Sequence, residues 1–222
     1  DVSTGLINVP DYRVIPGKYY PSHEAIDFYH RYKEDLQLMS EMGFNCLEQV
    51  FHGAYFPNGD DEEPNEAGLN YYEEMFNYML ELGMEPVITI SHYETPIHLV
   101  EQYGGWKSRE LICFFEKYCR TLFNRYKDLV KYWMTFNEIN NVHTIPFAAG
   151  AIRHDSNLQD KFQAAHNMFV ASSRANKLCH EIIPDAKIGC MLSLSGVYPA
   201  TCKPEDVMGA YNLRRRSLFS VM

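Results

Sequence analysis

Hydrophobic residues along the chain follow two different spacings. Four short stretches are almost continuously apolar and rich in β-branched or aromatic side chains, as in strands that are buried on both faces. These stretches are residues 44–51, 85–91, 131–137 and 187–193. Elsewhere, apolar residues recur every three or four positions, which predicts helices. The predicted helices are 22–42, 65–82, 96–102, 108–126, 158–183 and a last segment after Pro204.

The alternation of strand and helix predicts a parallel sheet with helical crossovers. Both a doubly wound sheet and a (β/α)8 barrel fit this pattern. No glycine-rich phosphate loop follows any predicted strand, which argues against nucleotide binding. His92 and Glu138 directly follow two of the strands, where α/β barrels keep their chemistry, and this favours the barrel.

A complete barrel needs about eight strands, and four are predicted here. We therefore expect an α/β protein with part of a (β/α)8 TIM barrel, about four strand–helix units. Residues 1–222 are expected to form one partial catalytic domain. The sequence begins at Asp1, which also suggests a fragment.

Composition narrows the classes of partner. The net charge of −9 argues against nucleic acid or an anionic membrane as the main partner. No apolar run approaches the length of a membrane span, and no signal-peptide pattern is present. The six cysteines contain no CxxC pair, which favours reduced, buried thiols in a cytoplasmic protein over disulfides or a metal site.

Glu138 is the leading candidate for chemistry. It follows the apolar stretch 131–137 and is surrounded by side-chain amides, among them Asn137. Glycoside hydrolysis generally needs two carboxyl groups, one of which donates a proton to the leaving oxygen. A glutamate emerging from a buried strand into a cleft suits that task, and Asn137 suits a hydrogen bond to a sugar hydroxyl. The alternative for Glu138 is a solvated loop residue.

Two further side chains are candidates for binding sugar. His92 follows the neighbouring strand and would point into the same cleft, although a structural histidine is the alternative. Trp106 follows two glycines on a predicted loop. It suits either an aromatic platform near a sugar or a place in the core.

These residues lie in motifs that resemble family-1 glycoside hydrolases. Residues 135–140, Thr-Phe-Asn-Glu-Ile-Asn, resemble the Thr-x-Asn-Glu acid/base motif of that family. Residues 91–96, Ser-His-Tyr-Glu-Thr-Pro, resemble its His-x-x-x-Pro sugar-binding segment, and segments 104–106 and 20–29 also match. Many β-glucosidases have Asn-Glu-Pro at the acid. The Asn-Glu-Ile-Asn-Asn found here is instead similar to the bacterial 6-phospho-β-glucosidases.

The resemblance implies a retaining glycosidase. Glu138 would be the general acid/base, Asn137 would bind the sugar 2-hydroxyl, and His92 would bind another hydroxyl of the same ring. The implied substrates are phosphorylated β-glucosides, such as cellobiose 6-phosphate or aryl glucoside phosphates. No metal or organic cofactor is implied.

The chain lacks parts of the family pattern. The first strand, with its sugar-binding Gln, and the later strands, with the nucleophilic Glu and the phosphate-binding loop, are not in the sequence. We therefore expect these 222 residues alone to be inactive. One alternative is a non-catalytic half-barrel that self-associates through uncovered sheet edges. Another is a family-1 β-glucosidase or β-galactosidase acting on unphosphorylated substrates.

Residues 48–56 also depart from the family. The family's second strand is approximately Arg-x-Ser-Ile-Ala-Trp-x-Arg-Ile-Phe-Pro, whereas this chain has Glu-Gln-Val-Phe-His-Gly-Ala-Tyr-Phe-Pro. With a suitable choice among the allowed codons, residues 48–56 read one base earlier can encode Arg-Ala-Ser-Val-Ser-Trp-Arg-Val-Phe, so we hypothesise a local frame slip. Resequencing that finds no slip would remove the hypothesis. Because Glu48 reverses the charge of a strand arginine expected to be buried, this strand is expected to pack poorly.

Overall fold

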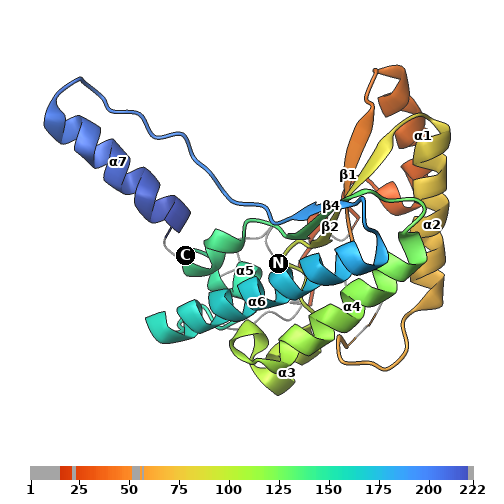
Figure 1. Cartoon of the computed structure of the whole chain (residues 1–222), viewed down its shortest axis with the longest axis horizontal. Coiled ribbons are helices and arrows are strands. Elements are labelled where there is room, and N and C mark those ends of the chain that lie inside the picture. Colours follow the sequence, from red (N-terminus) through yellow and green to blue (C-terminus); the bar gives the residue numbers. More distant parts are fainter. Residues whose placement is uncertain (1–15, 22–23, 52–55, 57, 220–222) are drawn as a thin grey trace.

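The computed structural model describes residues 16–21, 24–51, 56 and 58–219 (Figure 1). Its sheet consists of parallel strands, in the order β1-β2-β3-β4. These are β1 (Cys46–Val50), β2 (Glu85–Ser91), β3 (Tyr132–Phe136) and β4 (Lys187–Gly189). Each strand lies beside the one that precedes it in the chain, whereas the strand order of a doubly wound sheet reverses at a switch point. The order is therefore that of an arc of a (β/α)8 barrel, as predicted.

Helices connect the strands. The α-helices are α1 (Phe28–Glu41), α2 (Glu66–Glu81), α3 (Ile97–Tyr103), α4 (Glu110–Tyr126), α5 (Pro146–Gly150), α6 (Leu158–Ile182) and α7 (Pro204–Phe219). Two 3-10 helices are η5 (Gly105–Lys107) and η6 (Ile139–His143). The short helices η6 and α5 were not predicted, because the Asn-rich segment after Glu138 has no helical period. In Figure 1, α7 projects away from the body on an extended segment.

Helix α2 shows how the sequence sets the bounds of an element. The Asn65 side chain accepts the Gly68 N–H, which caps the first turn. Residues at helical spacing then face inward, and Met75, Phe76 and Met79 are almost fully buried. The chain leaves the helix through Gly83, whose φ of 75° is in the left-handed region that favours glycine.

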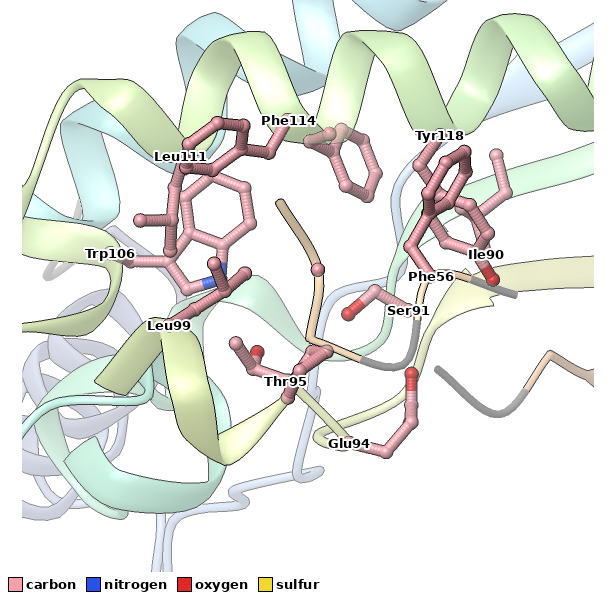
Figure 2. A pocket seen from close by; sticks show the side chains of 13 residues that line it. Phe56, Ile90, Ser91, Glu94, Thr95, Leu99, Trp106, Leu111, Phe114 and Tyr118 are labelled. Carbon is pink, nitrogen blue, oxygen red and sulfur yellow. The ribbon is translucent and has the colours of Figure 1, made fainter. Parts of the chain in front are cut away.

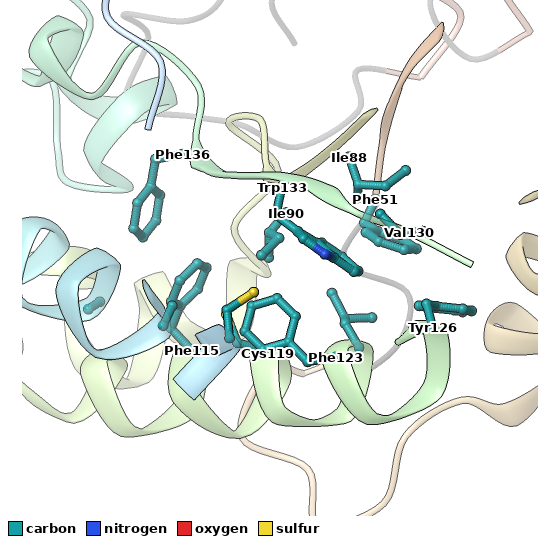
Figure 3. Close-up of a cluster of buried hydrophobic side chains, with 14 of the residues drawn as sticks. Phe51, Ile88, Ile90, Phe115, Cys119, Phe123, Tyr126, Val130, Trp133 and Phe136 are labelled. Atoms are coloured by element: carbon teal, nitrogen blue, oxygen red, sulfur yellow. The ribbon is translucent and has the colours of Figure 1, made fainter. Parts of the chain in front are cut away.

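The main core fills the space between the sheet and helix α4 (Figure 3). Phe136 stacks on Phe115 with ring centroids 4.5 Å apart, and Trp133 meets Phe123 edge to face at 5.0 Å. Phe51, at the end of β1, is fully buried and stacks near Trp133. Aromatic pairs of this kind contribute beyond the area they bury. The strands are thus held on their helical side by a packed aromatic layer.

Strand β1 corrects one expectation from the sequence. Glu48 is exposed rather than buried, and its carboxylate accepts the Thr89 hydroxyl at 2.5 Å. The strand pairs with β2 over all five of its residues. A charge that stays in contact with water has little desolvation cost, so the cost expected for a buried Glu48 does not arise in this chain, although none of the five strand residues is buried. Residues 52–55, the rest of the proposed frame slip apart from Phe56, lie outside the described residues.

The cysteines also differ from the prediction in part. Cys119 and Cys179 are buried, as expected, whereas Cys46, Cys113, Cys190 and Cys202 are exposed. All six are free thiols. Within the ranges described, every helix is too short or too polar to cross a membrane.

Candidate active site

The carboxyl ends of β2 and β3 lie side by side. Ser91 pairs with Phe136 in the parallel register, and the Asn137 N–H donates to the Ser91 carbonyl at 2.9 Å. The residues that follow, His92 and Glu138, are consequently brought to the same edge of the sheet. This is the edge at which barrel enzymes assemble their active sites.

Glu138 occupies an unusual backbone position. Its φ of 41° and ψ of 51° place it in the left-handed region, immediately before η6. A non-glycine residue there costs about 1–3 kcal/mol, so its surroundings must hold it. The next residue, Ile139, is fully buried, and its N–H donates to the Met191 carbonyl at 3.1 Å. The buried Ile139 thus holds the chain directly after the turn at Glu138.

One oxygen of the Glu138 carboxylate receives two hydrogen bonds. The Tyr93 hydroxyl donates to Oε2 at 2.9 Å, and the Asn141 side-chain amide donates to the same atom at 2.7 Å. The Asn141 amide also lies 3.2 Å from the Tyr93 hydroxyl oxygen. Hydrogen bonds to a carboxylate are charge-assisted and stronger than neutral ones. Glu138 is therefore held in one orientation.

Tyr93 was not predicted from the sequence. In a strand, the side chain after His92 would point to the opposite side of the sheet. Tyr93 instead has a φ of 75°, and this turn redirects its ring toward Glu138. Burial raises the pKa of Tyr93 to about 12, although hydrogen bonds from the Asn141 and Asn137 side chains oppose the rise. The phenol therefore keeps its proton, and remains a donor, at neutral pH.

Asn137 and His92 differ in accessibility. Asn137 is 5% exposed and lies beside the Tyr93 hydroxyl. The His92 side chain is exposed, and its imidazole makes no hydrogen bond to any described residue. The imidazole packs against the Tyr93 ring with centroids 5.2 Å apart. The imidazole is therefore accessible from outside the described part of the chain.

Trp106 lies in a different environment. It is 4% exposed and meets Phe136 and Phe115 edge to face, with ring centroids 5.1 and 5.7 Å away. Its backbone carbonyl accepts the Asn167 side-chain amide at 2.9 Å. These contacts match the alternative of a core residue, and they put its ring in the layer between sheet and helices.

Glu94 lines a mostly apolar cavity of about 60 Å³ behind the turn at His92 (Figure 2). Both oxygens of its carboxylate accept the His92 backbone N–H, at 2.8 and 2.9 Å. Burial raises the pKa of Glu94 to about 7, with the bond from the His92 backbone opposing it. Glu138 does not line this cavity. Glu94 therefore stabilises the turn that contains His92 and Tyr93. It lines a cavity that Glu138 does not line.

Acidic and metal-ligating side chains are dispersed over the described residues. No three His, Cys, Asp or Glu side chains in this part of the chain gather closely enough to hold a metal ion. The acidic residue Asp60 is instead hydrogen-bonded to nearby side chains. Its carboxylate accepts the Tyr103 hydroxyl at 2.9 Å and lies 2.9 Å from Nε2 of His98. The polar side chains at the ends of β2 and β3 include a carboxylate, a phenol, amides and an imidazole.

Known proteins match nearly the whole chain. The aryl-phospho-β-D-glucosidase BglH of Bacillus subtilis is 52% identical over 201 residues, which are 89% of this chain and 43% of that protein. The 6-phospho-β-glucosidase AscB of Escherichia coli is 46% identical over 208 residues, 92% of this chain and 44% of that protein. The chain thus spans less than half the length of these relatives.

A solved structure shows the same arrangement of elements. The β-glucosidase from Thermotoga maritima in complex with glucoimidazole superposes with a TM-score of 0.82 at 28% identity. The match covers 99% of this chain and 49% of that one. It supports the partial TIM barrel inferred from the strand order. The model of "Glycosyl hydrolase family 1" matches residues 12–220, and the chain therefore belongs to glycosyl hydrolase family 1.

Proposed function

We propose that this chain is part of a retaining glycosidase that hydrolyses 6-phospho-β-glucosides, with Glu138 as its general acid/base. The observation that carries the proposal is the carboxylate of Glu138, held by two donors at the carboxyl ends of adjacent parallel strands. The phosphorylated substrate is supported by the names of relatives, including the phospho-cellobiase of Klebsiella oxytoca at 47% identity.

In the proposed mechanism, Glu138 acts twice. It first donates its proton to the glycosidic oxygen as a second carboxylate attacks the anomeric carbon, and a covalent glycosyl-enzyme forms. It then takes a proton from the water that hydrolyses this intermediate. Asn137 would bind the sugar 2-hydroxyl and His92 a second hydroxyl of the same ring. Trp106, from its contacts, would support the site from the core rather than touch sugar.

The second carboxylate belongs to a part of the barrel that this chain does not contain. In retaining enzymes the two carboxyl groups are about 5–5.5 Å apart, so Glu138 needs this later part of the barrel beside it. We therefore propose that the 222 residues alone do not turn over substrate. The complete barrel, a single catalytic domain, would act in the cytoplasm, where phosphorylated sugars are available.

The test uses the chain in a completed barrel, with the missing segments taken from BglH. p-Nitrophenyl β-D-glucoside 6-phosphate should be hydrolysed, and Glu138→Gln should lower kcat/KM at least about 100-fold. Glu181→Gln, an exposed change on α6, is the matched control and should have no effect. Azide should restore turnover to Glu138→Ala, because it attacks the glycosyl-enzyme without needing a general base.

Three results would contradict the proposal. Full activity of Glu138→Gln would remove the acid/base assignment. Preference for unphosphorylated p-nitrophenyl β-D-glucoside would favour the β-glucosidase alternative. Glu138-dependent turnover by the 222 residues alone would show that the chain supplies its own nucleophile.

A further inference from the structure

Resting on the proposed function of Glu138, we propose that Tyr93 and Asn141 are positioning residues that anchor Oε2 of its carboxyl group, so that Oε1 carries the proton. Both donors converge on Oε2, at 2.9 and 2.7 Å. No hydrogen bond joins Oε1 to any residue that the structure describes. The two oxygens of one carboxyl group therefore have different surroundings.

This difference decides where a proton binds. A protonated carboxyl group has one hydroxyl oxygen, which donates, and one carbonyl oxygen, which only accepts. Oε2 already accepts two hydrogen bonds. A proton on Oε2 would point at groups that also donate, so Oε2 is better suited to remain the unprotonated, carbonyl oxygen. The proton consequently binds Oε1. When it moves to the glycosidic oxygen and the C–O bond breaks, the negative charge left on the carboxylate is shared with Oε2, whose two hydrogen bonds strengthen.

The two donors are held from opposite sides of the site. Tyr93 lies in the turn after β2. The backbone N–H of the preceding residue, His92, donates to the Glu94 carboxylate, and this bond fixes the turn. Asn141 lies one turn of η6 beyond Glu138, and its backbone N–H donates to the Glu138 carbonyl at 2.8 Å. The phenol is a donor throughout the catalytic cycle, because burial raises its pKa to about 12.

The first test uses the 222-residue chain and requires no activity. Glutamate side-chain carboxyls are labelled with ¹³C, and the resonance of Glu138 is recorded at neutral pH. Tyr93→Phe and Asn141→Ala should each change the chemical shift of this resonance, because each removes one of the two hydrogen bonds to Oε2. Tyr103→Phe is the matched control: it removes the phenol that donates to Asp60 and should leave the Glu138 resonance unchanged. An unmoved Glu138 resonance in both site variants, with native circular dichroism, would overturn the proposal.

The second test uses the completed barrel and varies the leaving group. Tyr93→Phe should lower kcat/KM about tenfold for cellobiose 6-phosphate, whose sugar leaving group needs the proton, the factor typical of one lost hydrogen bond. It should change kcat/KM less than about twofold for 2,4-dinitrophenyl β-D-glucoside 6-phosphate, whose leaving group departs without one. Equal losses on both substrates would mean a general structural role and would contradict the proposal.

These outcomes separate the two proposals. Full activity of Glu138→Gln would refute the proposed function, while the carboxyl resonances would still report whether Tyr93 and Asn141 anchor the carboxyl group. A large loss in Glu138→Gln, together with normal kinetics and an unmoved Glu138 resonance in Tyr93→Phe, would refute the anchoring alone.

Discussion

The layer between the sheet and helix α4 and the cluster at the ends of β2 and β3 use the same two strands. In the layer, Trp133 and Phe136 meet aromatic rings from α4 and are almost fully buried. At the ends, the chain takes left-handed conformations at Tyr93 and Glu138, and the side chains are polar and partly exposed. The aromatic layer is expected to stabilise the fold. The cluster at the strand ends is expected to contain strained backbone that orients its polar side chains.

Breaking the aromatic layer should have the largest effect on stability. Phe123 is fully buried against Trp133, so Phe123→Ala should lower the free energy of unfolding by about 3–5 kcal/mol. Urea unfolding followed by circular dichroism measures this. Tyr198→Ala, at a residue that is 86% exposed, is the control and should change it by less than about 0.5 kcal/mol. Equal losses in the two variants would mean that the layer is not the stabilising core.

Glu94 lies between the two regions and should give a pH effect of intermediate size. Its pKa rises on folding, from 4.5 to about 7, because of burial. The folded state thus keeps a proton that the unfolded state loses, so its contribution is present below pH 4.5 and is lost as pH rises toward 7. Because Glu94 is partly exposed, we expect a loss of about 1–2 kcal/mol between pH 5 and pH 7.5.

Urea unfolding at the two pH values measures this loss. Glu94→Gln removes the titrating group and should abolish that part of the pH dependence. A pH profile unchanged by Glu94→Gln would show that the side chain titrates normally in the folded chain.

Changing the carboxylate itself should have the smallest effect on stability. In Glu138→Gln the amide oxygen can still accept from Tyr93 and Asn141, so the free energy of unfolding should change by less than about 0.5 kcal/mol. Thermal or urea unfolding of the 222-residue chain measures it. A loss above about 2 kcal/mol would mean that Glu138 is part of the structural core, and the contrast between the two regions would disappear.

The sequence predicted the parts of the fold that depend on regular spacing. Strand β2 has the bounds expected from its apolar run, 85–91. Strand β4 was expected to extend to 193 but ends at Gly189. Beyond it the chain still bonds to its neighbour, since Met191 N–H donates to the Phe136 carbonyl at 2.9 Å, but the regular ladder does not continue. Periodicity predicts that a strand is buried, and it says less about where pairing stops.

The site was predicted in part for the same reason. Motif and strand end together placed His92, Asn137 and Glu138 at one edge of the sheet. Tyr93 was missed because its positive φ breaks the rule that successive strand side chains point to opposite faces of the sheet. A tyrosine in the sequence gives no sign of a positive φ. Trp106 could not be assigned from the sequence, because a tryptophan after two glycines is equally compatible with a binding platform and a buried ring.

The assignment of Glu138 is tested most directly by kcat/KM for p-nitrophenyl β-D-glucoside 6-phosphate in the completed barrel, with and without Glu138→Gln. We predict turnover that falls at least about 100-fold in the variant and an unchanged value in the Glu181→Gln control. Turnover that is the same with glutamine at position 138 would contradict the account.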